Sequence, residues 1–338
     1  MRKPKTIKIL SAPLTWLSCV ILLLISGCDS HSSAQQEQRY AKGAILAAQT
    51  SADGKITLVS SGLGPVQVWH ADARQPLYQW HQGQVSEPVL LLAIAPDSQY
   101  AATATERTVA IWSLVSGENQ GFYELNHTLR TLAIADHGQR LVLGYDNGEL
   151  EFIELSSGRR LVFMGHKATI NSVDLSANGR YALSADQAGQ VLLWDTQSAQ
   201  VLSQWQHTGS VTLVRLDPSG KVAFSASSQG EAQLHQLPSG KRLGVLAVPK
   251  RGQTFVSARF DNEHQQLLTG STARRLELWQ LNSGHLLEQW QVGTHTKLRP
   301  ASAMVLDVAF TDENQVFSVS SSGLGETWTI TSRDKNDE

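Results

Sequence analysis

The sequence contains almost no cysteine and none of the short motifs that mark common catalytic sites. Its two cysteines, Cys19 and Cys28, both lie near the start, so the rest of the chain can form neither a disulfide bond nor a thiolate metal site. The histidines are scattered, and the Gly-x-Ser-x-Gly, His-Glu-x-x-His and phosphate-loop motifs are absent. No long segment after residue 40 has apolar residues at the period of a helix. We therefore expect a non-enzymatic protein that lacks helices, metals and cofactors.

The first 28 residues have the pattern of an export signal. Four basic residues precede an apolar stretch, which ends in Ile25-Ser26-Gly27-Cys28. This ending resembles the bacterial lipoprotein signal, in which cleavage before the cysteine is followed by its acylation. A transmembrane anchor is the alternative, but the apolar run is short and is interrupted by Pro13 and Ser18. We expect residues 1–27 to be a signal peptide, Cys28 to be lipidated, and residues 28–37 to be a flexible tether.

The lipoprotein resemblance implies a protein of the bacterial cell envelope that faces the periplasm. Asp29 follows the lipidated cysteine and resembles a signal that retains lipoproteins in the inner membrane, although it is otherwise an ordinary polar linker residue. The inner membrane is therefore favoured slightly over the outer one. The chain has a net charge of −2, and all charged residues of the signal peptide are basic, so the remainder of the chain is more acidic. An acidic protein without long basic runs is a poor candidate for binding nucleic acid.

Tryptophan recurs at regular intervals in the rest of the chain. Three pairs are separated by eleven residues: Trp69 and Trp80, Trp194 and Trp205, and Trp279 and Trp290. A polar turn lies within each pair. The same spacing, with other residues in place of tryptophan, recurs elsewhere in the chain. In five of these turns the residue five positions after the first member of the pair is glycine or alanine: Gly117, Gly158, Ala199, Gly240 and Gly284. Glycine suits a hairpin position with positive φ. The pattern therefore predicts a repeated strand, tight turn and returning strand.

The repeat extends over seven units. Their anchor positions are separated by 41 to 49 residues and are occupied by Trp69, Trp112, Ile153, Trp194, His235, Trp279 and Trp328. A period of roughly 40–45 residues is typical of a four-stranded propeller blade. Two further strands precede each anchor, as in residues 170–175 and 181–184, with a polar turn between them. We predict an all-β, seven-bladed β-propeller of four-stranded antiparallel blades over residues 38–331, followed by a charged tail at 332–338.

The last blade lacks a fourth strand at its own end. The returning strand after Trp328 would need an apolar residue beyond Glu338, whereas the segment around Tyr40 and Gly43 resembles that around Trp80 and Gly83. An incomplete blade would expose a sheet edge. We therefore expect the N-terminal strand around Tyr40 to complete blade seven and close the ring.

At this point the sequence resembles the WD40 repeat family over roughly residues 38–330. Gly165-His166 is followed by Trp194-Asp195, which resembles the Gly-His and Trp-Asp frame of that family. The family's turn aspartate falls at Ala188 in this sequence. We therefore expect its His–Ser–Asp–Trp hydrogen-bond network to be broken in every blade, and His166 to bond the main chain instead. The resemblance implies a platform for protein–protein interaction.

Candidate partner-binding residues lie in loops expected on one face, the top face. It carries the loops leading into the innermost strands and those linking second to third strands. Six basic residues gather there on blades five to seven, and two leucines lie in matching Ser-Ser-Gly-Leu-Gly loops: Lys250, Arg251, Arg274, Arg275, Lys297, Arg299, Leu63 and Leu324. They fit a dock for an acidic envelope protein. Ordinary solvated charge and simple hairpin chemistry are the alternatives.

Two other functions remain open. A small-ligand sensor or a quinoprotein-like enzyme would use the central channel and would need charged residues converging on it. The polar residues of the innermost strands are Asp174, Arg215, Arg259 and Asp307, so their convergence would favour this alternative. An accessory to outer-membrane assembly is the other. The leading prediction is a non-enzymatic, lipid-anchored periplasmic platform that binds its partner through the top face.

Overall fold

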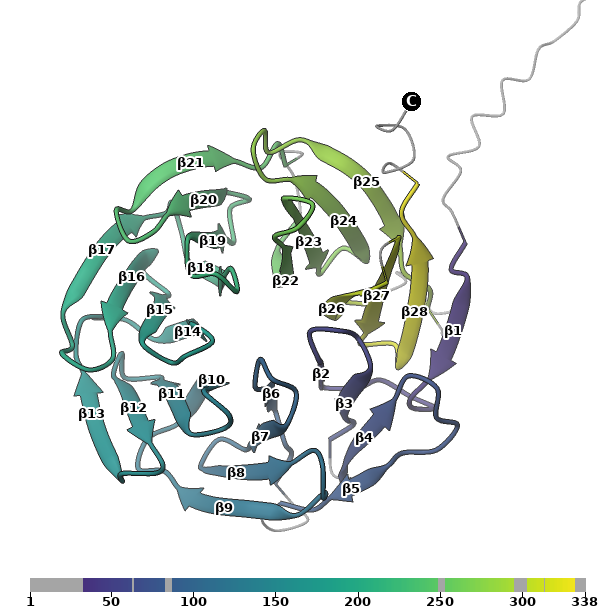
Figure 1. Ribbon diagram of the computed structural model, residues 1–338, viewed down its shortest axis with the longest axis horizontal. Helices are drawn as coiled ribbons and strands as arrows, with labels where there is room; N and C mark the ends of the chain where they lie inside the picture. Colours follow the sequence, from purple (N-terminus) through teal and green to yellow (C-terminus); the bar gives the residue numbers. More distant parts are fainter. Residues whose placement is uncertain are drawn as a thin grey trace, which may run out of the picture. The chain divides into compact units, whose positions relative to one another are not determined.

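The computed structural model describes residues 33–62, 64–82, 87–248, 253–294, 303–312 and 314–331. These residues form seven four-stranded antiparallel sheets arranged in a ring (Figure 1). They contain no helix, and hence none long and apolar enough to cross a membrane. The molecule is an all-β, seven-bladed β-propeller, which confirms the predicted fold class.

Blades one to six each consist of four consecutive strands, of which the first is innermost and the fourth lies at the rim of the ring. Blade one contains β2 (Ala47–Thr50), β3 (Ile56–Ser60), β4 (Val66–His70) and β5 (Tyr78–Trp80). Blade two contains β6 (Leu91–Ile94), β7 (Tyr100–Ala104), β8 (Thr108–Ser113) and β9 (Asn119–Glu124). Blade three contains β10 (Leu129–Ala135), β11 (Arg140–Tyr145), β12 (Leu150–Glu154) and β13 (Arg159–Phe163).

The second half of the ring repeats this order. Blade four contains β14 (Ile170–Leu175), β15 (Tyr181–Asp186), β16 (Gln190–Asp195) and β17 (Val201–Gln206). Blade five contains β18 (Val211–Leu216), β19 (Val222–Ser227), β20 (Ala232–Gln236) and β21 (Lys241–Val245). Blade six contains β22 (Phe255–Asp261), β23 (Gln266–Ser271), β24 (Arg275–Gln280) and β25 (Leu286–Gln291). Blade seven contains β26 (Val305–Asp312), β27 (Gln315–Ser320), β28 (Leu324–Thr329) and β1 (Gln36–Arg39).

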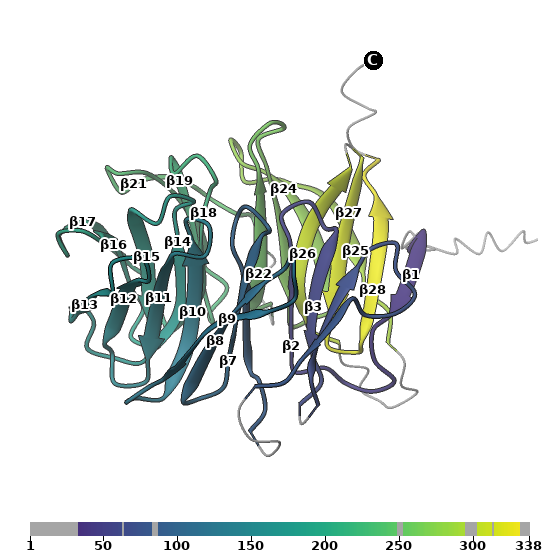
Figure 2. The same cartoon turned by 60° about the horizontal axis from the view of Figure 1, so that its bottom comes forward.

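Blade seven is completed by the N-terminal strand, as predicted. β1 pairs antiparallel with β28, with Gln36 opposite Thr327 and Arg39 opposite Leu324, and both views place it at the rim (Figure 2). β1 begins two residues before the expected start of the propeller at residue 38. Directly after it, the buried ring of Tyr40 meets Trp69 of blade one edge-on, with ring centroids 5.4 Å apart. Tyr40 therefore joins the last blade to the first.

The turns define the two faces of the ring. The top face carries the turns between second and third strands and the connections into the next blade. The bottom face carries the other two turns of each blade. The turns between third and fourth strands contain the predicted glycine or alanine, and at these positions φ lies between 60° and 76°. Left-handed backbone favours glycine because Cβ is crowded there, which is why glycine recurs in these turns.

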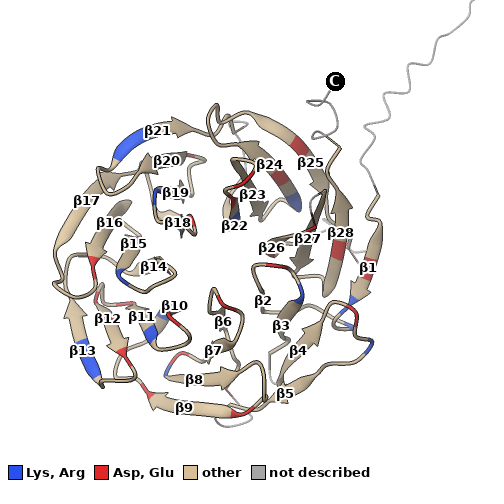
Figure 3. Cartoon of the chain, in the orientation of Figure 1, with Lys and Arg blue, Asp and Glu red and all other residues tan. Residues whose placement is uncertain are grey.

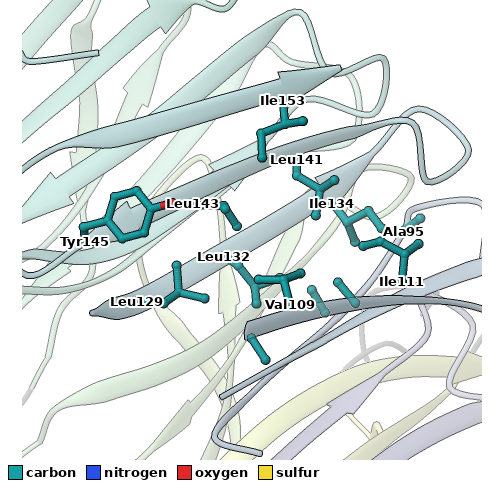
Figure 4. Packing of buried hydrophobic residues seen from close by; sticks show 13 residues of the cluster. Ala95, Val109, Ile111, Leu129, Leu132, Ile134, Leu141, Leu143, Tyr145 and Ile153 are labelled. Carbon is teal, nitrogen blue, oxygen red and sulfur yellow. The ribbon is translucent and has the colours of Figure 1, made fainter. Parts of the chain in front are cut away.

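The hydrophobic core lies between blades rather than within each one. In the cluster of Figure 4, Ile134 and Leu141 of blade three lie with Ala95, Val109 and Ile111 of blade two. Similar clusters join the other neighbours around the ring. Burying one such large aliphatic side chain contributes roughly 1.5–3 kcal/mol. Because each blade depends on its neighbours, the ring is a rigid frame for its faces and its axis.

Candidate functional site

A cavity of about 550 Å³ lies on the ring axis. Residues from the innermost strands of all seven blades line it, together with bottom-face turn residues such as Asp53, Pro96 and Pro218. The cavity therefore reaches the bottom face. Its walls include Asp174, Arg215 and Arg259, three of the four polar residues that the sequence singled out in the innermost strands.

The fourth residue, Asp307, lies beside Arg259. Its Oδ2 atom accepts hydrogen bonds from Gln49 Nε2 (2.7 Å), Thr50 N (2.7 Å), Thr50 Oγ1 (2.8 Å) and Arg259 Nη2 (3.3 Å). Arg259 also donates from Nη2 to the Thr50 carbonyl (2.9 Å). These contacts connect the innermost strands of blades six, seven and one. Three of the four polar residues thus face the channel and Asp307 lies in its wall, so the condition set for a ligand-binding channel is met in part.

Asp174, on blade four, lies on the other side of Arg215 from Arg259, and main-chain N–H groups bind its carboxylate. Its Oδ2 accepts from Leu216 N (2.7 Å) and its Oδ1 from Leu175 N (3.0 Å). Burial raises the pKa of Asp174, while the charge of Arg215 and these main-chain bonds act in the opposite direction. Across the described ranges, no group of three or more His, Cys, Asp or Glu residues is placed to hold a metal ion.

The candidate top-face residues fall into two groups. Lys250, Arg251, Lys297, Arg299 and Leu63 lie outside the described residues, as do Cys28 and Asp29. Arg274 donates from Nε (3.1 Å) and Nη2 (2.6 Å) to the carbonyl of Val292. Arg275 donates to Gln253 Oε1 (3.5 Å) and lies 3.9 Å from Glu277. Both arginines therefore hold connections within blade six as well as presenting charge.

Leu324 does not contribute to an exposed apolar patch. Its side chain is only 5% exposed, because β1 pairs across the start of β28 at this position. The expectation that Leu324 and Leu63 form a surface patch is wrong for Leu324. The sequence pattern predicts a loop at Leu324, whereas this residue is the first of β28 and pairs with Arg39 of the closing strand.

Blade four contains a complete buried polar network. His166 is hydrogen-bonded through Nδ1 to Asp186 Oδ2 (3.0 Å) and through Nε2 to Ser184 Oγ (2.8 Å), and Trp194 Nε1 donates to the same Ser184 Oγ (3.2 Å). The expectation that this network is broken in every blade, and that His166 bonds the main chain, is therefore wrong. Asp186 occupies the end of β15, two residues before the expected Ala188, and its carboxylate still reaches His166.

The network recurs with substitutions in other blades. In blade five, His207 bonds Ser225 (2.7 Å) and Glu231 (3.2 Å), and the anchor His235 stacks on Trp205 at 4.1 Å. Elsewhere an anchor tryptophan donates to a hydroxyl on the second strand, in the pairs Trp112 and Thr103, Trp279 and Thr269, and Trp328 and Ser318. The sequence signal for this hydrogen bond, which the sequence analysis did not use, is a serine or threonine nine or ten positions before the anchor tryptophan.

These buried groups are structural. The side chains of His166 and Asp186 are 0% and 1% exposed, so no substrate can reach them. Burial lowers the pKa of His166, although Asp186 acts in the opposite direction. A neutral imidazole can bond Asp186 and Ser184 at once, one nitrogen as donor and the other as acceptor. Ser184, His166 and Asp186 are the residue types of a catalytic Ser–His–Asp triad, but here they form a buried structural network.

Residues 158–195 match the WD domain, G-beta repeat family. The matched WD repeat runs from β13 to the end of β16 and contains the complete network of blade four. A stretch of 165 residues is 27% identical to transcription initiation factor TFIID subunit 5 of Caenorhabditis elegans, covering 45% of this chain and 24% of that protein. A stretch of 113 residues is 28% identical to pre-mRNA-processing factor 19 of Schizosaccharomyces pombe, covering 33% of this chain and 23% of that protein.

A third similar protein is WD repeat-containing protein SL1-17 of Schistosoma mansoni, 23% identical over 155 residues, which are 45% of this chain and 51% of that protein. The chain thus spans about a quarter of the length of the first two relatives and about half of the third. The WD repeat match covers the outer strand of blade three and the first three strands of blade four, which hold the complete network. The other blades keep the same strands around altered polar residues.

Proposed function

We propose that this protein is a non-enzymatic, lipid-anchored scaffold that binds another protein at the periplasmic side of a bacterial membrane. The observation that carries the proposal is a self-closed propeller in which residues 158–195 match a WD repeat and hold a complete polar network. Propellers of this kind typically serve as interaction scaffolds. One relative is by name the subunit of a larger factor, which agrees with a role in an assembly.

The direction of β1 supports a membrane-facing bottom face. β1 starts beside Thr327, near the bottom-face end of β28, and ends beside Leu324 at the top face. The chain therefore enters the propeller from the bottom face. The polar residues 29–35 between Cys28 and β1 would span about 13–16 Å if they behave as a coil. We propose that the bottom face lies nearest the bilayer and that the top face receives the partner, an envelope protein with an acidic surface.

The anchor is tested by substituting Cys28 in the full chain. In a Gram-negative host, Cys28→Ser should abolish incorporation of labelled palmitate and release the protein from the membrane fraction. Asp29→Ser should move the lipidated protein from inner-membrane to outer-membrane fractions on a density gradient. Membrane retention of the unlabelled Cys28→Ser variant would contradict lipid anchoring.

The binding face is tested by photo-crosslinking in intact cells. A photoreactive residue placed at Asn147 or Gln229, in top-face turns, should crosslink a discrete partner. The same residue at Asn178 or Ser219, in bottom-face turns, is the matched control and should not. Equal crosslinking from both faces would contradict use of the top face.

A further inference from the structure

The channel has one level at which charged and small residues are separated. Seven residues occupy the same register position in the innermost strands, each paired with the equivalent second-strand residue: Gln49, Ala93, Ala133, Asp174, Arg215, Arg259 and Ala309. Six of them line the cavity. The charged residues are consecutive, on blades four, five and six. The alanines, on blades two, three and seven, occupy the rest of this level together with Gln49 of blade one and add little bulk to it.

The hydrogen bonds at and beside this level engage the carboxylates more fully than they engage Arg215. One Asp307 oxygen accepts four hydrogen bonds, and each Asp174 oxygen accepts a main-chain N–H. Arg215, by contrast, donates within the described residues only from Nη1 to the Val214 carbonyl (2.9 Å). A guanidinium carries five N–H donors. Most of the donors of Arg215 are therefore available to whatever occupies the channel.

The exposed fractions of the side chains also distinguish Asp307 from Arg259. The side chain of Asp307 is 3% exposed, whereas that of Arg259, bonded to it, is 24% exposed. The carboxylate lies in the wall and the guanidinium lies at its surface. Arg215 is likewise partly exposed and lines the cavity one blade away. The surface that a ligand would meet thus carries two neighbouring guanidinium groups, with the partly exposed Asp174, whose oxygens accept main-chain N–H groups, on the other side of Arg215.

We propose that the channel binds a small organic anion, whose carboxylate or phosphate group is held by Arg215 with Arg259 beside it. The planar fork of a guanidinium matches both anions and can bind them with two parallel hydrogen bonds. The cavity of about 550 Å³ has the size of small-molecule sites, which span roughly 300–1,000 Å³. This site lies on the axis and is separate from the proposed partner-binding face.

The bottom-face rim carries several carboxylates that an entering anion has to pass. Figure 3 shows acidic and basic positions together on the turns around the centre. Several rim carboxylates are paired with a basic side chain nearby, in Asp53 with Lys55, Asp97 with His137, Asp136 with Arg140, and Asp261 with His264. Lys55 and Arg140 partly offset the charge of Asp53 and Asp136, whereas the two histidines offset that of their partners only when they are protonated.

Titration calorimetry on the purified full chain tests the proposal, with citrate and inorganic phosphate as the two probes. At least one probe should bind, and which one does so identifies the anionic group. Arg215→Met keeps the aliphatic stem but removes the donors, so it should weaken binding by roughly tenfold or more. Arg242→Met, on the exposed outer strand β21 of the same blade, is the matched control and should bind like the parent chain.

Two further variants separate binding from folding. Arg215→Lys keeps the charge without the fork and should bind with intermediate affinity. Ala93→Gln, on blade two across the ring from Arg215, narrows the channel at the same level and should weaken citrate more than phosphate. Absence of binding by both probes, or equal binding by Arg215→Met and Arg242→Met, would overturn the proposal. Neither result bears on whether the top face binds a protein.

Discussion

At the scale of single residues, Ser184 is the side chain on which the polar network of blade four depends. Its hydroxyl contacts both His166 and Trp194, and all three groups are buried. Removing it leaves two buried polar atoms without this partner, and each such loss costs about 1–3 kcal/mol. We therefore expect Ser184→Ala to lower the free energy of unfolding by at least about 1 kcal/mol in urea titrations.

Ser203 provides the matched control in the same blade. Its buried hydroxyl has no hydrogen-bond partner among the described residues, so Ser203→Ala removes a polar group that gains nothing from folding. This variant should be as stable as the parent chain or more stable. Equal destabilisation by both substitutions would show that the loss at Ser184 reflects packing rather than the network.

Glu277 gives the molecule a pH-dependent weakness at the same scale. Its carboxyl is 1% exposed, and burial raises its pKa from 4.5 to about 7, against the opposing effects of Gln253 and Arg275. The folded state therefore binds the proton more tightly than the unfolded chain does. Stability should fall as the pH rises from about 4.5 to about 7 and stay low above it.

The glutamine variant tests this contribution. Glu277→Gln should stabilise the protein at pH values above that window by on the order of 2–3 kcal/mol and flatten the pH dependence of the urea midpoint. Glu326 has a similarly raised pKa of about 7, so part of the dependence should persist. The exposed Glu118→Gln is the control and should leave the profile unchanged. A profile equally steep in Glu277→Gln would refute the assignment.

At the scale of elements, β1 is the strand whose loss opens the ring. Tyr40 fixes it, because its main-chain N–H donates to the Gly323 carbonyl (2.9 Å) and its ring contacts Trp69 of blade one. Truncating a buried aromatic side chain costs about 3–5 kcal/mol. We expect Tyr40→Ala to destabilise by that amount and to make β1 accessible to protease. Tyr40→Phe, which keeps the ring contact, should remain close to the parent chain in both assays.

The elements were predictable where one signal repeats along the chain. The anchor spacing indicated the number of blades, and Gly117 and Ala199 marked turns whose φ is positive. The likeness between Tyr40 and Trp80 indicated the closing strand. Prediction failed where function or packing depends on a contact across the fold. Asp186 reaches His166 from outside the expected position, and Leu324 is covered by a strand from the other terminus.

The candidate site shows the same division. The sequence indicated that Asp174, Arg215, Arg259 and Asp307 are polar residues in innermost strands. Only the register of seven strands shows that three of them share one level, and that Asp307 is turned into the wall against Thr50. Hydrogen-bond saturation, which distinguishes Arg215 from its neighbours, is a property of geometry that no spacing encodes.

At the scale of the whole molecule, the boundary between blades seven and one is where the two ends of the ring meet. It is held at the rim by Tyr40 and at the channel by Asp307, which bonds Gln49 and Thr50 across the boundary. Because the hydrophobic clusters join neighbouring blades, each blade loses support when this boundary opens. Contacts at its two edges should therefore stabilise the same closed state.

A double-mutant cycle tests this coupling. Asp307→Ala leaves the partly buried Arg259 without its carboxylate and should alone cost on the order of 3 kcal/mol. Once Tyr40→Ala has opened the boundary, the further loss from Asp307→Ala should be smaller, giving a coupling free energy of about 1 kcal/mol or more. Asp307→Ala combined with Ser184→Ala, in distant blade four, is the control and should be additive. Additivity in both pairs would mean that the boundary does not open as a unit, and that closure of the ring rests on each edge separately.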